Sequence, residues 1–194
     1  DFTINALAVQ LSGNRGKFGQ LFDLHRGVQH LESGQLVVLH DQSFIDDPAR
    51  LLRGMRFQTR FSFSFDAWTQ RLAEEAVCQR LLLELPPGRR FDEFRKALDD
   101  PQPGLILEAC SHAGLLSQVA PWLTAWDAAV RARIDAAVAH GARLTGEQRR
   151  PQWKWACAGL LAATSDRVGR GWLEELEVGA SLIDELFAVR ELLQ

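Results

Sequence analysis

The spacing of hydrophobic residues changes along the chain. Up to about residue 40, apolar residues alternate with polar ones or form short runs, at Phe2, Ile4, Ala6, Ala8 and Leu11 and again at Phe18, Leu21 and Phe22. Residues 12–16, which contain Gly and Asn, separate the two runs and are typical of a turn. Residues 36–39 form another short apolar run. We therefore predict short strands over residues 1–40, with open edges that cannot form a stable domain alone.

From Ser43 onward the pattern becomes helical. Residues 66–85 carry apolar side chains at helical intervals and end at Pro86-Pro87-Gly88. A second helix is predicted over residues 90–98, and later ones over 125–140, 153–163, 170–177 and 181–193, with breaks at Gly141, Gly146 and Gly179. Tryptophans spread along this part at helical spacing are typical of a core rather than of base-stacking platforms: Trp122, Trp126, Trp153, Trp155 and Trp172. The pattern predicts a mainly α fold.

One predicted helix, within residues 44–61, has a charged row on one side. Asp47, Arg50 and Arg53 are three residues apart, which places them on neighbouring turns of one face. Apolar residues such as Leu51 and Leu52 supply the other side. Asp47 before a proline is also typical of a helix start, with Asp as the N-cap. The two interpretations are compatible, since a capping residue can still face a ligand.

The hydrogen-bonding chemistry of Asp47 and Arg50 matches two nucleobases. An ionised Asp only accepts hydrogen bonds, and Arg only donates them. Cytosine and adenine each present an amine donor beside a ring acceptor, whereas uracil and guanine present a carbonyl where Asp47 needs a donor. A mismatch would leave buried polar groups unpaired, which strongly disfavours the wrong base. The pair could therefore select C and A over U and G.

Composition restricts the class of protein. The 194 residues, with 46% hydrophobic and 24% charged side chains, are those of an ordinary globular protein of one or two domains. The net charge of −3 argues against a surface that coats nucleic acid broadly but allows a local basic patch. One cluster fits such a patch, although ordinary surface residues are the alternative: Arg143, Arg149, Arg150 and Lys154.

Cysteine usage and hydropathy point to the cytoplasm. Cys78, Cys110 and Cys157 are odd in number, far apart and without metal-ligand spacing, so we expect reduced, mostly packed thiols. The sequence has no membrane-spanning run, and we expect no membrane partner. His40-Asp41 resembles part of a metal phosphohydrolase motif, but the other histidines lack matching context. A loop before the charged helix is the interpretation we adopt for this pair.

Two stretches resemble one known family. Residues 46–57, Asp-Asp-Pro-Ala-Arg-Leu-Leu-Arg-Gly-Met-Arg-Phe, resemble the neck-helix motif Glu-Asp-x-x-Arg of class II tRNA nucleotidyltransferases and bacterial poly(A) polymerases, with Asp46 where Glu is usual. Residues 1–8, Asp-Phe-Thr-Ile-Asn-Ala-Leu-Ala, are similar to the end of the head motif Arg-Arg-Asp-Phe-Thr-Ile-Asn-Ala. The two motifs occur in the family's order, and the similarity covers roughly the first 125 residues.

The resemblance implies a division of the chain and roles for its residues. Residues 1–42 would be the remnant of a β-containing catalytic head, 43–100 a helical neck that selects the base, and 101–194 a helical body that binds tRNA. The implied nucleotide-binding residues are Asp47, Arg50, Arg53, Arg56, Asp1 and Asn5. Arg143, Arg149, Arg150 and Lys154 become candidate contacts to tRNA phosphates. Asp23 lies in a stretch that departs from the family's loop, and we expect it to be structural.

The family's chemistry also implies groups that these residues do not supply. The resemblance implies CTP and ATP as substrates, the tRNA 3′ end as acceptor, and Mg²⁺ on a pair of aspartates of the head, which are absent from this chain. We therefore expect no catalytic or metal-binding residue here, a longer parent protein in the cytoplasm, and an inactive isolated fragment. Two alternatives remain open: a poly(A) polymerase, or another subtype, of the same family, and a helical RNA-binding protein without catalysis.

Overall fold

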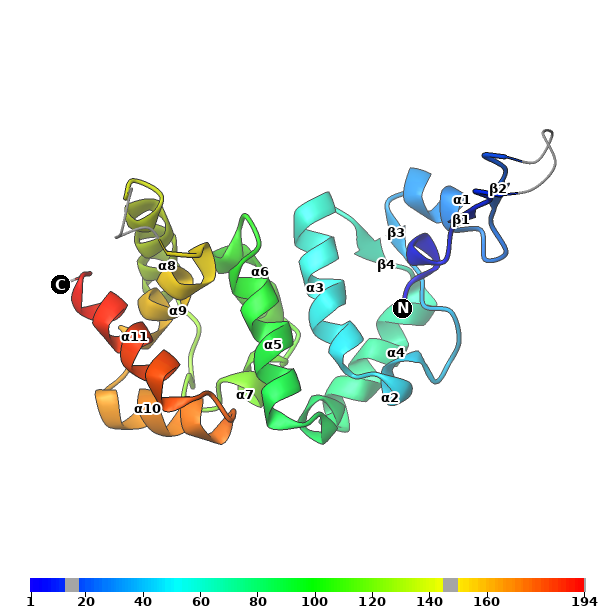
Figure 1. The fold of residues 1–194 in the computed structure, drawn as a ribbon. Coiled ribbons are helices and arrows are strands. Elements are labelled where there is room, and N and C mark those ends of the chain that lie inside the picture. Colours follow the sequence, from blue (N-terminus) through cyan, green and yellow to red (C-terminus); the bar gives the residue numbers. More distant parts are fainter. Residues whose placement is uncertain (13–17, 145–149, 194) are drawn as a thin grey trace.

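A computed structural model describes residues 1–12, 18–144 and 150–193. Helices dominate, and the chain extends from its N-terminal segment at one end of an elongated molecule to its C-terminal helices at the other (Figure 1). This arrangement confirms the predicted mainly α fold.

The first forty residues contain little regular strand. The elements are the 3₁₀ turn η1 (Thr3–Asn5), β1 (Ala8–Val9), β2 (Leu21–Phe22), α1 (Gly27–Glu32) and β3 (Gln35–Leu36). β1 pairs antiparallel with β2, and β3 pairs parallel with β4 (Ser64–Phe65). The predicted turn at residues 12–16 lies mostly outside the described residues. Short strands are thus confirmed at three places, but strand character was wrong for residues 3–5 and 27–32.

Helix α1 has a local cause that the apolar pattern did not reveal. The carboxylate of Asp23 accepts the backbone N–H groups of Gly27 at 2.7 Å, Val28 at 3.0 Å and His25 at 3.3 Å. These bonds, that to Val28 first, lower the pKa of Asp23. The contacts satisfy donors at the start of α1, as a capping residue does. Asp23 therefore has the structural role that we expected.

The middle of the chain forms a stack of helices. In order these are α2 (Ser43–Asp46), α3 (Ala49–Phe61), α4 (Ala67–Cys78), the 3₁₀ turn η2 (Leu81–Glu84) and α5 (Pro87–Leu98). Asp66 caps α4, since its carboxylate accepts the N–H of Thr69 at 2.9 Å. The helix predicted over 66–85 is too long, because Arg80 adopts a left-handed conformation that ends it.

The last part is also helical. Helices α6 (Pro103–His112) and α7 (Leu116–Val119) were not predicted, whereas α8 (Ala128–Gly141), α9 (Gln152–Leu161), α10 (Asp166–Glu175) and α11 (Ala180–Glu191) match the four predicted segments with shifted ends. The predicted break at Gly146 lies outside the described residues. One hydrophobic cluster contains buried residues from Phe2 to Phe187 and so runs through all three predicted segments. The division at residues 42 and 100 stays a prediction.

The aromatic residues of this part belong to the core. Trp153, Trp155 and Trp172 are buried, and Trp122 and Trp126 pack against the core from partly buried positions. Trp172 also donates its indole N–H to the carbonyl of Val119 at 2.7 Å. The prediction that these tryptophans build the core is confirmed.

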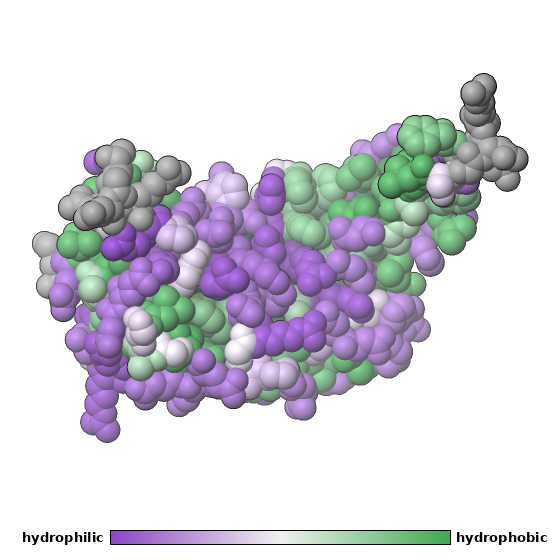
Figure 2. All heavy atoms as spheres, in the orientation of Figure 1, coloured by the Kyte–Doolittle hydropathy of each residue, from purple (hydrophilic) through white to green (hydrophobic). Residues whose placement is uncertain are grey.

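The surface differs between the ends of the molecule. Figure 2 shows a polar band across the central helices and hydrophobic side chains gathered around the N-terminal elements. The antiparallel pair β1–β2 and the residues around it expose several large apolar side chains: Val9, Leu11, Phe18, Leu21, Phe22 and Leu24. Exposed apolar patches of this kind are typical of surfaces that contact other protein. Among the described residues, no helix is long and apolar enough to cross a membrane.

Candidate functional site on helix α3

The start of α3 presents Asp47 as predicted. The regular helix begins at Ala49, but the Asp47 backbone is extended and its Oδ1 accepts the N–H of Ala49 at 3.3 Å. This is the hydrogen bond of an N-cap. The opposite side of α3 is buried through Leu51, Leu52 and Met55. Burial of that side directs the charged residues toward the neighbouring helix α5.

Helix α5 supplies charged partners for the row on α3, and the two helices lie side by side (Figure 1). The carboxylate of Asp47 accepts from Arg89 Nη2 at 2.9 Å, and Arg53 Nη2 lies 3.8 Å from Glu93 Oε1. Just beyond α5, Asp100 Oδ2 accepts from Arg56 Nε at 3.3 Å. We call these residues the α3–α5 polar row: Asp47, Arg50, Arg53, Arg56, Arg89, Glu93 and Asp100.

Asp1 joins the row through Arg53. The Nη1 atom of Arg53 donates to Asp1 Oδ2 at 2.7 Å, so Arg53 lies between Asp1 and Glu93. Asp1 is placed there because Phe2 is fully buried and Thr3 N–H donates to the carbonyl of Val37 at 2.8 Å. The prediction that Asp1 lies near the nucleotide stays a prediction, but its side chain does lie at the charged row.

Asn5 is placed differently from the rest of the predicted set. It ends the turn η1 and is exposed, and within the described residues its side chain makes no hydrogen bond. In the described structure Asn5 thus makes no side-chain hydrogen bond to the polar row. Its predicted role in nucleotide binding stays a prediction.

Arg50 differs from the other arginines of the row. Its Nη1 donates to the carbonyl of Ser43 at 2.6 Å, while its Nε is buried and without a hydrogen-bond partner in the described part of the chain. Arg53 and Arg56 have carboxylate partners, but no carboxylate of the described residues lies within ion-pair distance of Arg50. The Arg50 Nη2 donates no hydrogen bond within the described residues either, so the guanidinium keeps donor capacity that these residues do not use.

Asp47 has one carboxylate oxygen in use and one that remains. Oδ1 accepts from both Ala49 N–H and Arg89, and among the described residues no hydrogen bond to Oδ2 is present. The side chain of Asp47 is 17% exposed, which leaves it accessible but largely shielded. The sequence predicted this combination of an acceptor, the Asp47 carboxylate, and a donor, the Arg50 guanidinium, about one helical turn apart.

Sequence reasoning missed the residues of α5. Arg89, Glu93 and Lys96 recur at helical intervals along one face, and Lys96 Nζ lies 2.7 Å from Glu93 Oε1. That recurrence could have identified a charged face on α5. It could not have shown that the face meets α3, because the pairs are about forty residues apart in the chain.

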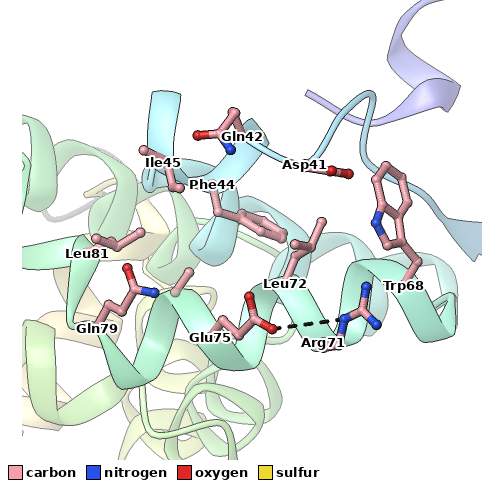
Figure 3. Close-up of a pocket in the computed structure, with 11 residues that line it drawn as sticks. Asp41, Gln42, Phe44, Ile45, Trp68, Arg71, Leu72, Glu75, Gln79 and Leu81 are labelled. Carbon is pink, nitrogen blue, oxygen red and sulfur yellow. Dashed lines mark ion pairs between the residues drawn. The ribbon is translucent and has the colours of Figure 1, made fainter.

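A pocket lies beside α2, away from the residues of the polar row. This pocket of about 410 Å³ opens between α2 and α4, where Leu72 lies beside Phe44 and Trp68 lies near Asp41 (Figure 3). Arg71 and Glu75 line it, with Arg71 Nε 4.0 Å from Glu75 Oε1. No member of the α3–α5 polar row lines this pocket. It is therefore distinct from the candidate site.

The basic cluster of the C-terminal part is partly neutralised. Arg150 Nε lies 3.3 Å and Lys154 Nζ 2.5 Å from the two carboxylate oxygens of Glu185 on α11. Arg143 is exposed just after α8, and Arg149 lies outside the described residues. The predicted tRNA contacts of this cluster stay a prediction, and any such contact would compete with Glu185 for Arg150 and Lys154.

The described residues do not assemble a metal centre. No group of three His, Cys, Asp or Glu side chains within them could hold a metal ion. His40 and Asp41 lie in the turn before α2, and His40 Nε2 is 3.7 Å from Asp46 Oδ2. The loop interpretation of His40-Asp41 is therefore confirmed.

The described chain is mainly helical and carries a row of charged residues on one face of α3. Solved structures have the same fold. A tRNA-processing enzyme in an apo form superposes with a TM-score of 0.80 at 30% identity, covering 100% of this chain and 53% of that one. A CCA-adding enzyme in complex with ATP gives a TM-score of 0.78 at 27% identity, covering 98% of this chain and 45% of that one.

Curated relatives agree with the solved structures. The A-adding tRNA nucleotidyltransferase of Aquifex aeolicus is 32% identical over 179 residues, which are 91% of this chain and 21% of that protein. The CCA-adding enzyme of Bordetella bronchiseptica is 36% identical over 148 residues, which are 75% of this chain and 38% of that protein. No family model matches the chain. The chain belongs to the tRNA nucleotidyltransferase family, and it spans well under half the length of these two relatives.

Proposed function

We propose that the protein containing this chain adds C, A or both to the 3′ end of tRNA without a nucleic-acid template. In this proposal the α3 face selects the incoming base. The observation that carries it is the pair formed by Asp47 Oδ2, which accepts no hydrogen bond from the described residues, and Arg50, whose guanidinium donates only to the Ser43 carbonyl within them. An acceptor beside a donor imitates the pairing edge of a template base.

Selection follows from the cost of a mismatch. With CTP or ATP, Asp47 Oδ2 accepts from the exocyclic amine and Arg50 donates to the neighbouring acceptor of the base. With UTP or GTP, Asp47 faces a carbonyl oxygen, and both acceptors remain unpaired in a largely shielded site. Discrimination of this kind reaches several orders of magnitude in enzymes that select by hydrogen bonds.

The substrates and the acceptor are supported by relatives of the chain. CCA-adding enzymes of the same fold have been solved with ATP, with CTP and with tRNA. We propose the same substrates and the tRNA 3′ end as partner here. The three cysteines are free, which agrees with the proposed cytoplasmic location.

The proposed Mg²⁺ ions are assigned to residues outside these 194. The described residues do not offer a ligand set that fits Mg²⁺. When bound by carboxylates elsewhere in the protein, such ions would activate the attacking RNA hydroxyl and stabilise the leaving pyrophosphate. The contribution of this chain is to bind and orient the base, and the isolated chain should not add nucleotides.

The test is nucleotide incorporation by the full-length protein. Radiolabelled CTP and ATP are supplied separately and together to tRNAs that lack CCA, that end in CC, and that are complete. Addition of C, A or both to the matching ends, with rejection of UTP and GTP, is expected and identifies the subtype. Addition of a long A tail would favour the poly(A) polymerase of the same family, and no incorporation would favour a helical RNA-binding protein.

A further inference from the structure

We propose that Arg89 on α5 is a positioning residue that orients the carboxylate of Asp47 for base selection. This inference rests on the proposed function of the α3 face. Arg89 is not predicted to touch the nucleotide, and its effect is exerted through Asp47.

The first argument is how the oxygens of Asp47 are used. Arg89 Nη2 donates to Oδ1 at 2.9 Å, and Ala49 N–H donates to the same oxygen at 3.3 Å. Two donors from different helices fix both the position and the rotation of the carboxylate. The second oxygen, Oδ2, is then held at a defined angle to accept from the base. With Ala49 as the only donor, the carboxylate could rotate and present either oxygen.

The second argument is that local helix energetics do not explain Arg89. It lies in the first turn of α5, which begins at Pro87. A positive charge near a helix N-terminus is unfavourable, because the helix dipole is positive at that end. The contact with Asp47 on α3 supplies the compensating interaction.

The third argument concerns exposure. The side chain of Arg89 is 51% exposed, and an ion pair this accessible contributes little to folding stability. A variant of Arg89 should therefore leave the fold intact, which separates orientation of Asp47 from general stability. The contact uses one nitrogen of the guanidinium, so a lysine could replace it as a point charge.

Helix α5 also contacts Arg53, the arginine of the row that follows Arg50 on α3. Glu93, one turn after Arg89, lies 3.8 Å from Arg53 and 4% of its surface is exposed. Its Oε2 is buried without a hydrogen-bond partner in the described residues. α5 therefore contacts the α3 face at two successive turns, and the orientation of Asp47 depends on where α5 lies.

The experiment compares Arg89→Ala and Arg89→Lys in the full-length protein. The kcat and KM values for CTP, UTP, ATP and GTP are measured on tRNA that lacks its 3′ end. Arg89→Ala should lower the C over U and A over G ratios of kcat/KM several-fold, because a carboxylate free to rotate no longer presents Oδ2 to the base in every bound complex. Arg89→Lys should restore most of both ratios.

A matched control removes an arginine of similar exposure. Arg71→Ala on α4 breaks an exposed ion pair with Glu75, away from the polar row, and should leave both ratios unchanged. The thermal unfolding midpoint of Arg89→Ala should equal that of the wild type, so altered selectivity cannot be attributed to unfolding.

Three outcomes would overturn the inference. Unchanged ratios in an active Arg89→Ala protein would show that Asp47 needs no positioning by α5. An equal rise in KM for all four nucleotides would place Arg89 at the triphosphate instead. A wild-type protein that adds neither C nor A would overturn the proposed function itself, and the role of Arg89 with it.

Discussion

At the scale of single residues, the charged side chains of α3 differ in which of their atoms are already used. Arg53 and Arg56 are bound by carboxylates of the protein, while among the described residues Arg50 is held only through the Ser43 carbonyl and its buried Nε has no partner. The sequence placed Asp47, Arg50 and Arg53 on one face but could not rank them. In the described part of the chain, Arg50 is the member of the three arginines that has no carboxylate partner, and its role in nucleotide binding stays a proposal.

We predict that Arg50→Ala in the full-length protein damages base choice more than RNA binding. Loss of the donor should reduce the C over U ratio of kcat/KM by at least about tenfold, because the base loses a charged hydrogen bond. The tRNA Kd should change little. Arg60→Ala, which removes an exposed arginine from the last turn of the same helix, is the matched control. Unchanged selectivity in Arg50→Ala would contradict the role of Arg50.

We also predict that the three thiols react at different rates. Burial raises the pKa of Cys110 and of Cys157 to about 12, whereas Cys78 is exposed. At pH 8 the two buried residues hold on the order of one part in 10⁴ as the reactive thiolate. Peptide mapping after brief iodoacetamide treatment should find Cys78 labelled alone, and all three labelled in denaturant. Fast labelling of Cys157 in the native protein would show that its helix opens readily.

At the scale of elements, α3 is shaped by a close contact with β4. A Cβ on Gly54 would lie 2.4 Å from Phe65 Cζ and 3.2 Å from Phe2 Cζ. The ring of Phe65 cannot move freely, because it is nearly buried and stacks on Phe2 with centroids 5.9 Å apart. Glycine at this position lets the polar face of α3 and the Phe2 segment that carries Asp1 come together.

Two glycine substitutions test this contact. Gly54→Ala should lower the free energy of unfolding by about 1–3 kcal/mol, because overpacking exceeds the gain in helix propensity. Gly171→Ala on α10 is the matched control, since nothing lies within 4 Å of the added Cβ, and should raise it by about 0.5–1 kcal/mol. Urea unfolding measures both. A stabilised Gly54→Ala would mean that the Phe65 ring yields without cost.

At the scale of the whole molecule, the positive charge available to bind RNA depends on which basic residues are paired with carboxylates, and not on the net charge alone. The net charge of −3 already argued against a broadly basic surface, and the one basic cluster singled out in the sequence is partly paired with Glu185. A tRNA phosphate would have to displace that carboxylate from Arg150 and Lys154.

We predict that Glu185→Gln strengthens tRNA binding. Removing the competing carboxylate should lower the Kd for tRNA several-fold at low salt. The slope of log Kd against log salt concentration should also become steeper, by up to the contribution of about two phosphate contacts. Asp184→Asn removes an equal charge from the same helix, where Asp184 pairs with Arg170 at 2.8 Å, and should have a smaller effect. Filter binding of the full-length protein across a salt series measures both. Equal effects of the two variants would remove the cluster from the RNA interface.

The sequence by itself determined the features that depend on residues close together along the chain. Apolar periodicity predicted most of the helices, the charged row followed from three-residue spacing, and two short motifs indicated the family. These inferences succeed because side-chain direction and capping in a helix depend on residues within a turn or two. They fail where a single polar side chain starts a short helix, as Asp23 does before α1.

Only the tertiary structure decided which charges meet. Asp47 binds Arg89, Arg56 binds Asp100, and Lys154 binds Glu185, each pair more than thirty residues apart in the chain. Such pairs depend on how whole helices pack, and packing is set by the buried faces rather than by the charged ones. For this reason the α3 face was visible in the sequence, while the residues that orient it were not.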